Sequence, residues 1–95
     1  MRKERKRQEA QRRRELQPLK NQLKKLELQL AEYQAKQQSL ESLLADNDLY
    51  REDRKEELKR HLAEKTEVDR QLQRMEESWL DISEKLEAAQ TAETY

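Results

Sequence analysis

Two apolar seams, each with alternating steps of three and four residues, constrain this fold more than any other sequence feature. The first seam consists of Leu16, Leu19, Leu23, Leu26, Leu30, Tyr33, Gln37, Leu40 and Leu44. The second seam consists of Leu58, His61, Lys65, Val68, Leu72, Met75, Trp79, Ile82, Leu86 and Ala89. A mean period of about 3.5 residues is typical of helices that supercoil around a partner helix. Each seam therefore predicts a long helix that requires a partner.

The composition agrees with an all-α chain that reverses direction rarely. The 95 residues include no Gly and one Pro, the residues on which the turns of sheet proteins rely. Hydrophobic residues make up only 33% of the chain, too few to fill a broad globular core. The charged fraction is 44%, which fits long helices once the apolar residues are known to lie in seams.

The segment between the two seams predicts the chain reversal. Asp46, Asn47 and Asp48 are short polar residues that favour turns over helix. Asp53 followed by Glu56 has the form of a capping box, which predicts that the second helix begins at position 53. Two long helices joined by a short connection pack antiparallel. We therefore predict a two-helix antiparallel coiled-coil hairpin with helices at 18–45 and 53–91 and a tip at 46–52.

Seam periodicity allows two registers of this hairpin, which differ by one heptad. In one register Leu23 faces Met75, Tyr33 faces Lys65 and Gln37 faces His61, so that polar seam residues meet near the tip. The other register needs a longer connection between the helices. On that ground the first register is the expected one.

Pro18 divides the chain into two predicted parts. Proline lacks an amide hydrogen and clashes with the preceding helical turn, so it predicts a kink in the first helix. Residues 1–17 are then a basic helical extension, called the lead-in below, and residues 18–91 form the hairpin. Residues 92–95 lack seam residues and are expected to fray.

The lead-in is the strongest candidate for a binding surface. Residues 1–14 contain two acids and eight cations: Arg2, Lys3, Arg5, Lys6, Arg7, Arg12, Arg13 and Arg14. Such a cluster can neutralise phosphates and give salt-sensitive, sequence-tolerant binding to nucleic acid. The alternative is pairing with the acidic end of the second helix, where the expected register brings Glu84 and Glu87 near Arg14.

The tip offers a second candidate contact through Tyr50, Arg51, Arg54 and Lys55, which could touch a polyanion. In the alternative interpretation, Leu49 and Tyr50 fold back over the end of the seams. Neither interpretation involves catalysis.

No sequence motif points to an active site. The chain has no Cys, no Gly-rich phosphate loop and a single His, so we expect no catalytic, cofactor-binding or metal-binding residues. His61 is expected to pair with Gln37 inside the seam, and Trp79 to pack there. The absence of an apolar run of about 20 residues and of a signal peptide predicts a soluble, cytoplasmic chain without membrane contact. Because the hairpin satisfies its own seams, we expect a monomer.

A group of short motifs resembles the C-terminal coiled-coil domain of bacterial ABC-F ATPases, closest to the YheS-like branch and related to the Uup branch. The motifs are Arg5-Lys6-Arg7-Gln8-Glu9-Ala10, Gln17-Pro18-Leu19, Leu44-Ala45-Asp46-Asn47-Asp48-Leu49-Tyr50, Glu77-Ser78-Trp79-Leu80 and Leu86-Glu87. The resemblance covers roughly residues 3–90. It implies a cytoplasmic parent with two upstream ATP-binding cassettes that bind ATP and Mg²⁺ and act in translation. It also implies that this segment is an arm that contacts DNA, the ribosome or the parent's own ATPase domains.

Overall fold

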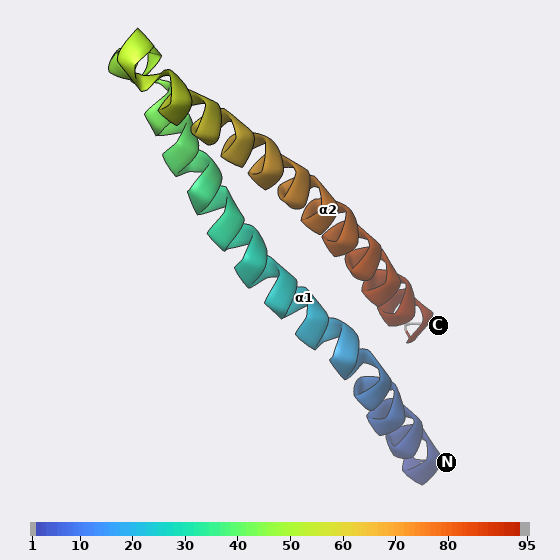
Figure 1. Cartoon of the computed structure of the whole chain (residues 1–95). Coiled ribbons are helices and arrows are strands. Elements are labelled where there is room, and N and C mark those ends of the chain that lie inside the picture. The colour runs from blue at the N-terminus through green and yellow to red at the C-terminus, as the bar shows by residue number, and fades with distance from the viewer. Residues whose placement is uncertain (1, 94–95) are drawn as a thin grey trace.

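The computed structural model describes residues 2–93 of the chain, and the side chains of residues 3–91. Helix α1 runs from Arg2 to Leu44 and helix α2 from Lys55 to Glu93. The two helices lie antiparallel in a rod that measures 76 × 16 × 15 Å (Figure 1). The predicted fold class, an all-α antiparallel hairpin, is confirmed. No helix within residues 2–93 is long and apolar enough to cross a membrane.

The seams form the contact between the helices, because every residue of both seams is buried or half-buried. Leu40, Val68 and Leu72 form the buried centre of this contact, and Leu30 and Tyr33 pack against them. Most other positions of both helices are exposed. Burial of about 25 cal/mol per Å² of apolar surface along these two stripes is therefore what holds the rod together.

The connection between the helices is longer and more ordered than the predicted tip at 46–52. It runs over residues 45–54 and contains two short 3₁₀ helices, η1 (Asn47–Tyr50) and η2 (Glu52–Arg54). The Asp46 carboxylate caps η1 by accepting from the Asp48 amide at 3.1 Å. Leu49 in η1 is only 1% exposed, which confirms that it folds back onto the helices.

The predicted capping box at the start of α2 is wrong. Asp53 lies inside η2, and its Oδ1 atom is 3.4 Å from Arg51 Nε. Helix α2 begins two residues later than predicted, at Lys55. The two side chains that a capping box would use have other partners: Asp53 lies beside Arg51, and Glu56 Oε1 is 3.6 Å from Lys59 Nζ.

The expected helix register is also wrong. Gln37 does not face His61: its Nε2 atom donates to Asp69 Oδ1 at 2.8 Å. Near the middle of the rod, Trp79 Nε1 donates to Glu27 Oε1 at 3.2 Å. Both contacts belong to the register displaced by one heptad from the expected one. The longer connection makes that register possible, because η1 covers the first turns of α2 that extend past the end of α1.

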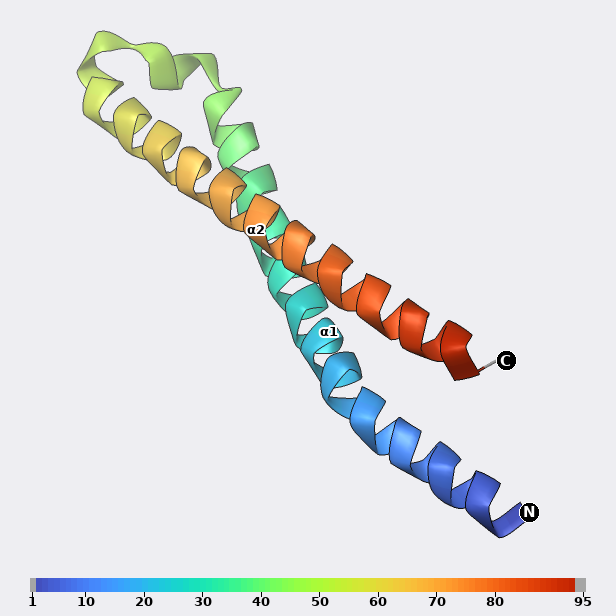
Figure 2. The same cartoon turned by 90° about the vertical axis from the view of Figure 1, so that its right-hand side faces the viewer.

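Pro18 does not divide the first helix into two. Helix α1 continues through Pro18 without interruption, and Figure 2 shows that it bends gently toward its N-terminal end. Pro18 is exposed, so water can reach the backbone carbonyl that loses its hydrogen-bond partner there. The lead-in and the first helix of the hairpin are therefore one continuous helix, α1. Ala92 and Glu93 are helical too, whereas residues 94 and 95 of the predicted frayed tail lie outside the described residues.

Truncation of a central seam residue should test this packing. Leu72 is 5% exposed, so Leu72→Ala should lower the free energy of unfolding by about 2–3 kcal/mol. Leu28 is 69% exposed, so Leu28→Ala should change that free energy by no more than about 0.5 kcal/mol. Urea denaturation followed by circular dichroism measures both. Equal losses for the two variants would contradict the seam packing.

Candidate nucleic-acid interface

Most of the lead-in extends past the end of α2 as a single unpaired helix. Figures 1 and 2 show the N-terminal segment of α1 projecting beyond the C-terminal end of α2. Every residue from Lys3 to Glu15 is exposed. The heptad positions that continue the first seam into this segment hold Arg12, Glu9 and Arg5 instead of leucines. A helix with charged seam positions offers a partner helix no apolar surface to bury, so pairing with α2 would not stabilise this segment.

The lead-in cations repeat at intervals of seven residues and cover most of the helix surface. Positions 5 and 12, 6 and 13, and 7 and 14 each hold a pair of cations, and seven residues span about two helical turns. The remaining strip of the helix carries Glu4, Gln8, Gln11 and Glu15. The segment thus presents rows of cations about 10 Å apart along its axis.

This charge pattern is unfavourable for the helix itself. Cations near a helix N-terminus oppose the helix dipole, and only Glu4 counters it in the first turn of α1. Lys3 and Arg7 are also like charges at a spacing of four residues, which destabilises a helix. A bound polyanion would relieve both costs.

The lead-in cations from Lys3 to Arg14 form no ion pair with the described side chains of α2, which end at position 91. Among the side chains of residues 3–91, no ion pair involves any cation from Lys3 to Arg14. The alternative that Arg14 pairs with Glu84 and Glu87 is therefore wrong for this register, because the one-heptad displacement carries the acidic end of α2 away from the lead-in. The side chain of Arg2, the eighth predicted cation, lies outside the described side chains.

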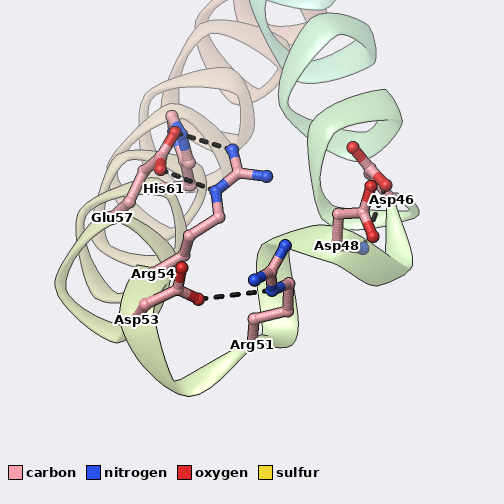
Figure 3. Close-up of polar contacts among 7 residues, drawn as sticks. All are labelled: Asp46, Asp48, Arg51, Asp53, Arg54, Glu57 and His61. Atoms are coloured by element: carbon pink, nitrogen blue, oxygen red, sulfur yellow. Dashed lines mark hydrogen bonds and ion pairs between the residues drawn. The ribbon is translucent and has the colours of Figure 1, made fainter.

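The two arginines of the tip, Arg51 and Arg54, lie beside neighbouring acids instead (Figure 3). Arg54 donates to Glu57 through two nitrogens, each at 3.0 Å, from Nε to Oε2 and from Nη2 to Oε1. This hydrogen bonding lowers the pKa of Glu57 and raises the pKa of Arg54. Arg51 lies beside Asp53, as described above, so two of the four predicted tip residues already have anionic partners.

Tyr50 and Lys55 are the other two predicted tip residues. Tyr50 is 56% exposed, and its hydroxyl donates to the Leu44 backbone carbonyl at 2.7 Å. The ring is therefore held against the end of α1 while most of its surface faces water, so it covers the seams less than Leu49 does. Lys55 is exposed at the start of α2.

His61 and Asp69 show where the sequence interpretation missed a contact. His61 is half-buried, and its Nε2 atom lies 3.7 Å from Glu57 Oε1. Its Nδ1 atom lies 3.9 Å from Glu64 Oε2, is buried and makes no hydrogen bond. Asp69 binds both Gln37 and Lys65, at 2.8 and 2.7 Å. The spacing of four residues between Lys65 and Asp69 was the available sequence signal. Within residues 2–93, no group of three or more His, Asp or Glu residues is placed to hold a metal ion.

In comparisons with known proteins, no family model, no curated protein and no solved structure matches this chain. The ABC-F resemblance therefore stays a prediction that rests on the sequence motifs.

Acidification should destabilise the hairpin through two of the contacts described above. Hydrogen bonds from Lys65 and Gln37 lower the pKa of Asp69, as Arg54 lowers that of Glu57. A carboxyl group with a lowered pKa in the folded state stabilises the fold at neutral pH, and this stability is lost as the pH falls below its ordinary pKa of about 4. Thermal melts at pH 7 and pH 2.5 should show a lower Tm in acid.

The control is the double variant Glu57→Gln and Asp69→Asn, in which neither group titrates. Its Tm should fall less between pH 7 and pH 2.5 than that of the unmodified chain. An equal fall in both proteins would mean that these two carboxylates do not contribute.

Proposed function

We propose that this chain is a non-catalytic interaction arm whose lead-in contacts nucleic acid, DNA or ribosomal RNA, through backbone phosphates. The observation that supports this most is the projecting helix, on which seven described cations are exposed and none has an anionic partner among the described side chains. Cations that are buried or already paired with carboxylates are poorly placed to neutralise phosphates. Exposed and unpaired cations can do so, and the resulting release of counterions from the nucleic acid dominates non-specific affinity.

The lead-in suits phosphate contact better than base recognition or membrane binding. Residues 3–15 include no aromatic side chain on which a base could stack. The same residues include no large apolar side chain, whereas a helix that lies on a membrane needs an apolar face. Binding should therefore tolerate many sequences and depend strongly on salt.

We further propose that the arm belongs to an ABC-F type cytoplasmic ATPase that acts in translation. In this proposal ATP and Mg²⁺ bind to upstream cassettes, and the arm, monomeric on its own, contacts the ribosome or the parent's own ATPase domains. The motifs quoted above support it, from the basic run at 5–10 to the Trp79-Leu80 pair. Two tandem ATP-binding cassettes in the protein sequence upstream of this chain would agree with the proposal, and their absence would contradict it.

Charge reversal in the lead-in should abolish most nucleic-acid binding. At about 50 mM salt, the chain should bind a labelled DNA duplex and a ribosomal RNA hairpin with a Kd in the micromolar range. The triple variant Arg12→Glu, Arg13→Glu and Arg14→Glu should raise both Kd values at least about tenfold and flatten their dependence on salt. Fluorescence anisotropy across a salt series measures these changes.

A matched control reverses three cations at the other end of the rod: Lys55→Glu, Lys59→Glu and Arg60→Glu. These side chains are exposed as well, so net charge changes equally in the two triple variants. The tip variant should keep most of the affinity if the lead-in is the interface. Equal losses would instead assign binding to overall charge, and no binding at about 50 mM salt would contradict the proposal.

Docking on a protein is the second candidate function, and one surface favours it. An open groove of about 700 Å³ runs between the helices near the connection. Tyr33, Leu40, Leu43 and Val68 supply its apolar surface, and Lys36 Nζ lies 4.7 Å from the centre of the Tyr33 ring. If the chain fails to bind nucleic acid while the hairpin stays folded, this groove becomes the leading candidate surface.

A further inference from the structure

Asp69 joins one polar seam residue from each helix, at a level seven residues before the end of α1 at Leu44. Gln37 belongs to the first seam and Lys65 to the second, and neither finds a polar partner at its own seam level. Asp69 lies just outside the second seam and accepts from Gln37 Nε2 with Oδ1 and from Lys65 Nζ with Oδ2. One carboxylate thus satisfies a polar residue from each helix, and this bridge links α1 to α2.

The seams alone do not select the observed register. A displacement of one heptad places most leucines opposite apolar residues again, because the pattern repeats every seven residues, although Leu86 then faces Arg12. The displaced register would even pair polar with polar side chains, with Gln37 facing His61 and Lys65 facing Tyr33. Contacts outside the seams therefore contribute to the choice of the observed register. The bridge at Asp69, the hydrogen bond from Trp79 to Glu27 and the burial of Leu49 in the connection are features that depend on it.

We propose that Asp69 is a register latch, which holds α2 one heptad away from a second register in which the acidic end of α2 covers the lead-in. Polar groups inside coiled coils are known to fix register at a cost in stability, and Asp69 does so here from the flank of the seam.

The second register would change the charge of the lead-in surface. A slide of seven residues moves α2 by about 10 Å along α1, toward the lead-in. Glu84 and Glu87 then lie beside Arg14, where the observed register leaves this cation without a partner. Release of the latch therefore masks the cations that the proposed function uses. This consequence for binding rests on the proposed function, whereas the latch itself does not.

Disulfide trapping can report the two registers separately, because the chain contains no cysteine of its own. The contacts of Gln37 with Asp69 and of Glu27 with Trp79 place Leu23 opposite Ile82 in the observed register. In the second register Leu23 faces Met75. The pair Leu23→Cys with Ile82→Cys therefore traps the observed register, and the pair Leu23→Cys with Met75→Cys traps the second.

With Asp69 intact, oxidation should close the 23–82 disulfide and leave the 23–75 pair mostly reduced. Asp69→Ala should raise the rate of 23–75 disulfide formation at least about tenfold, because this rate follows the population of the second register, which loss of the bridge increases. Asp69→Asn keeps an oxygen for Gln37 but loses the charge that attracts Lys65, so it should give an intermediate rise. If Asp69→Ala unfolds the chain, Asp69→Asn becomes the variant that tests the latch.

The matched control is Asp81→Ala. Asp81 pairs with Lys85, four residues on, at 3.1 Å, but among the described side chains it makes no hydrogen bond or ion pair with α1. This variant should leave the 23–75 rate unchanged. An unchanged rate in both Asp69 variants, or an equal rise in Asp81→Ala, would overturn the latch.

The two trapped forms then test the masking. A 20-base-pair DNA duplex at about 50 mM salt should bind the 23–82 form as it binds the reduced chain, and the 23–75 form at least about fivefold more weakly. Reduction of the disulfide should restore binding. Equal affinities of the two trapped forms would overturn the masking. If neither form binds DNA, the proposed function fails, while the trapping rates still decide the latch.

Discussion

The pairing of two leucine-lined helix faces within one chain is the interaction on which the rest of this structure depends. Nearly all of the large apolar residues that become buried lie in the two seams or in Leu49 of the connection. The described rod, about 15 Å thick, has no other core, so the paired parts of the two helices depend on each other for their stability. The exposed faces are then free to carry charge at little cost to the fold, and the uneven distribution of that charge is the main functional signal.

The register converts this pairing into an asymmetric molecule. Because α2 is displaced toward the connection, its first turns pass the end of α1 and are covered by η1, while the lead-in is left without a partner helix. The same displacement separates Arg14 from Glu84 and Glu87, the acids that the expected register would have placed beside it. In the proposed latch, a contact in the half of the rod nearer the connection, at Asp69, thereby affects a charged surface far along α1 through the rigidity of the paired helices.

Sequence periodicity was sufficient for the helices and their buried faces, and it was insufficient for their alignment. All seam positions were predicted, from Leu16 to Ala89, because a 3-4 pattern admits one buried face per helix. The register could not be predicted, because a heptad pattern looks the same after a shift of seven residues. The choice between the two registers depends on Asp69 and on the folded connection. Pro18 misled for a related reason: local propensity predicts a break, but a single lost hydrogen bond on an exposed surface is tolerated. The lead-in cations were found from composition, but their lack of partners required the register.

A distance between spin labels on the exposed faces of the two helices tests the pairing most directly. Leu28 on α1 and Leu80 on α2 are 69% and 54% exposed, so labels at both positions should leave the seams intact. With helix axes 8–10 Å apart and labels of ordinary length, pulsed electron paramagnetic resonance should give a distance of about 20–30 Å within a monomer. A continuous helix would instead separate the two positions by about 78 Å, and a distance of that order would contradict the hairpin.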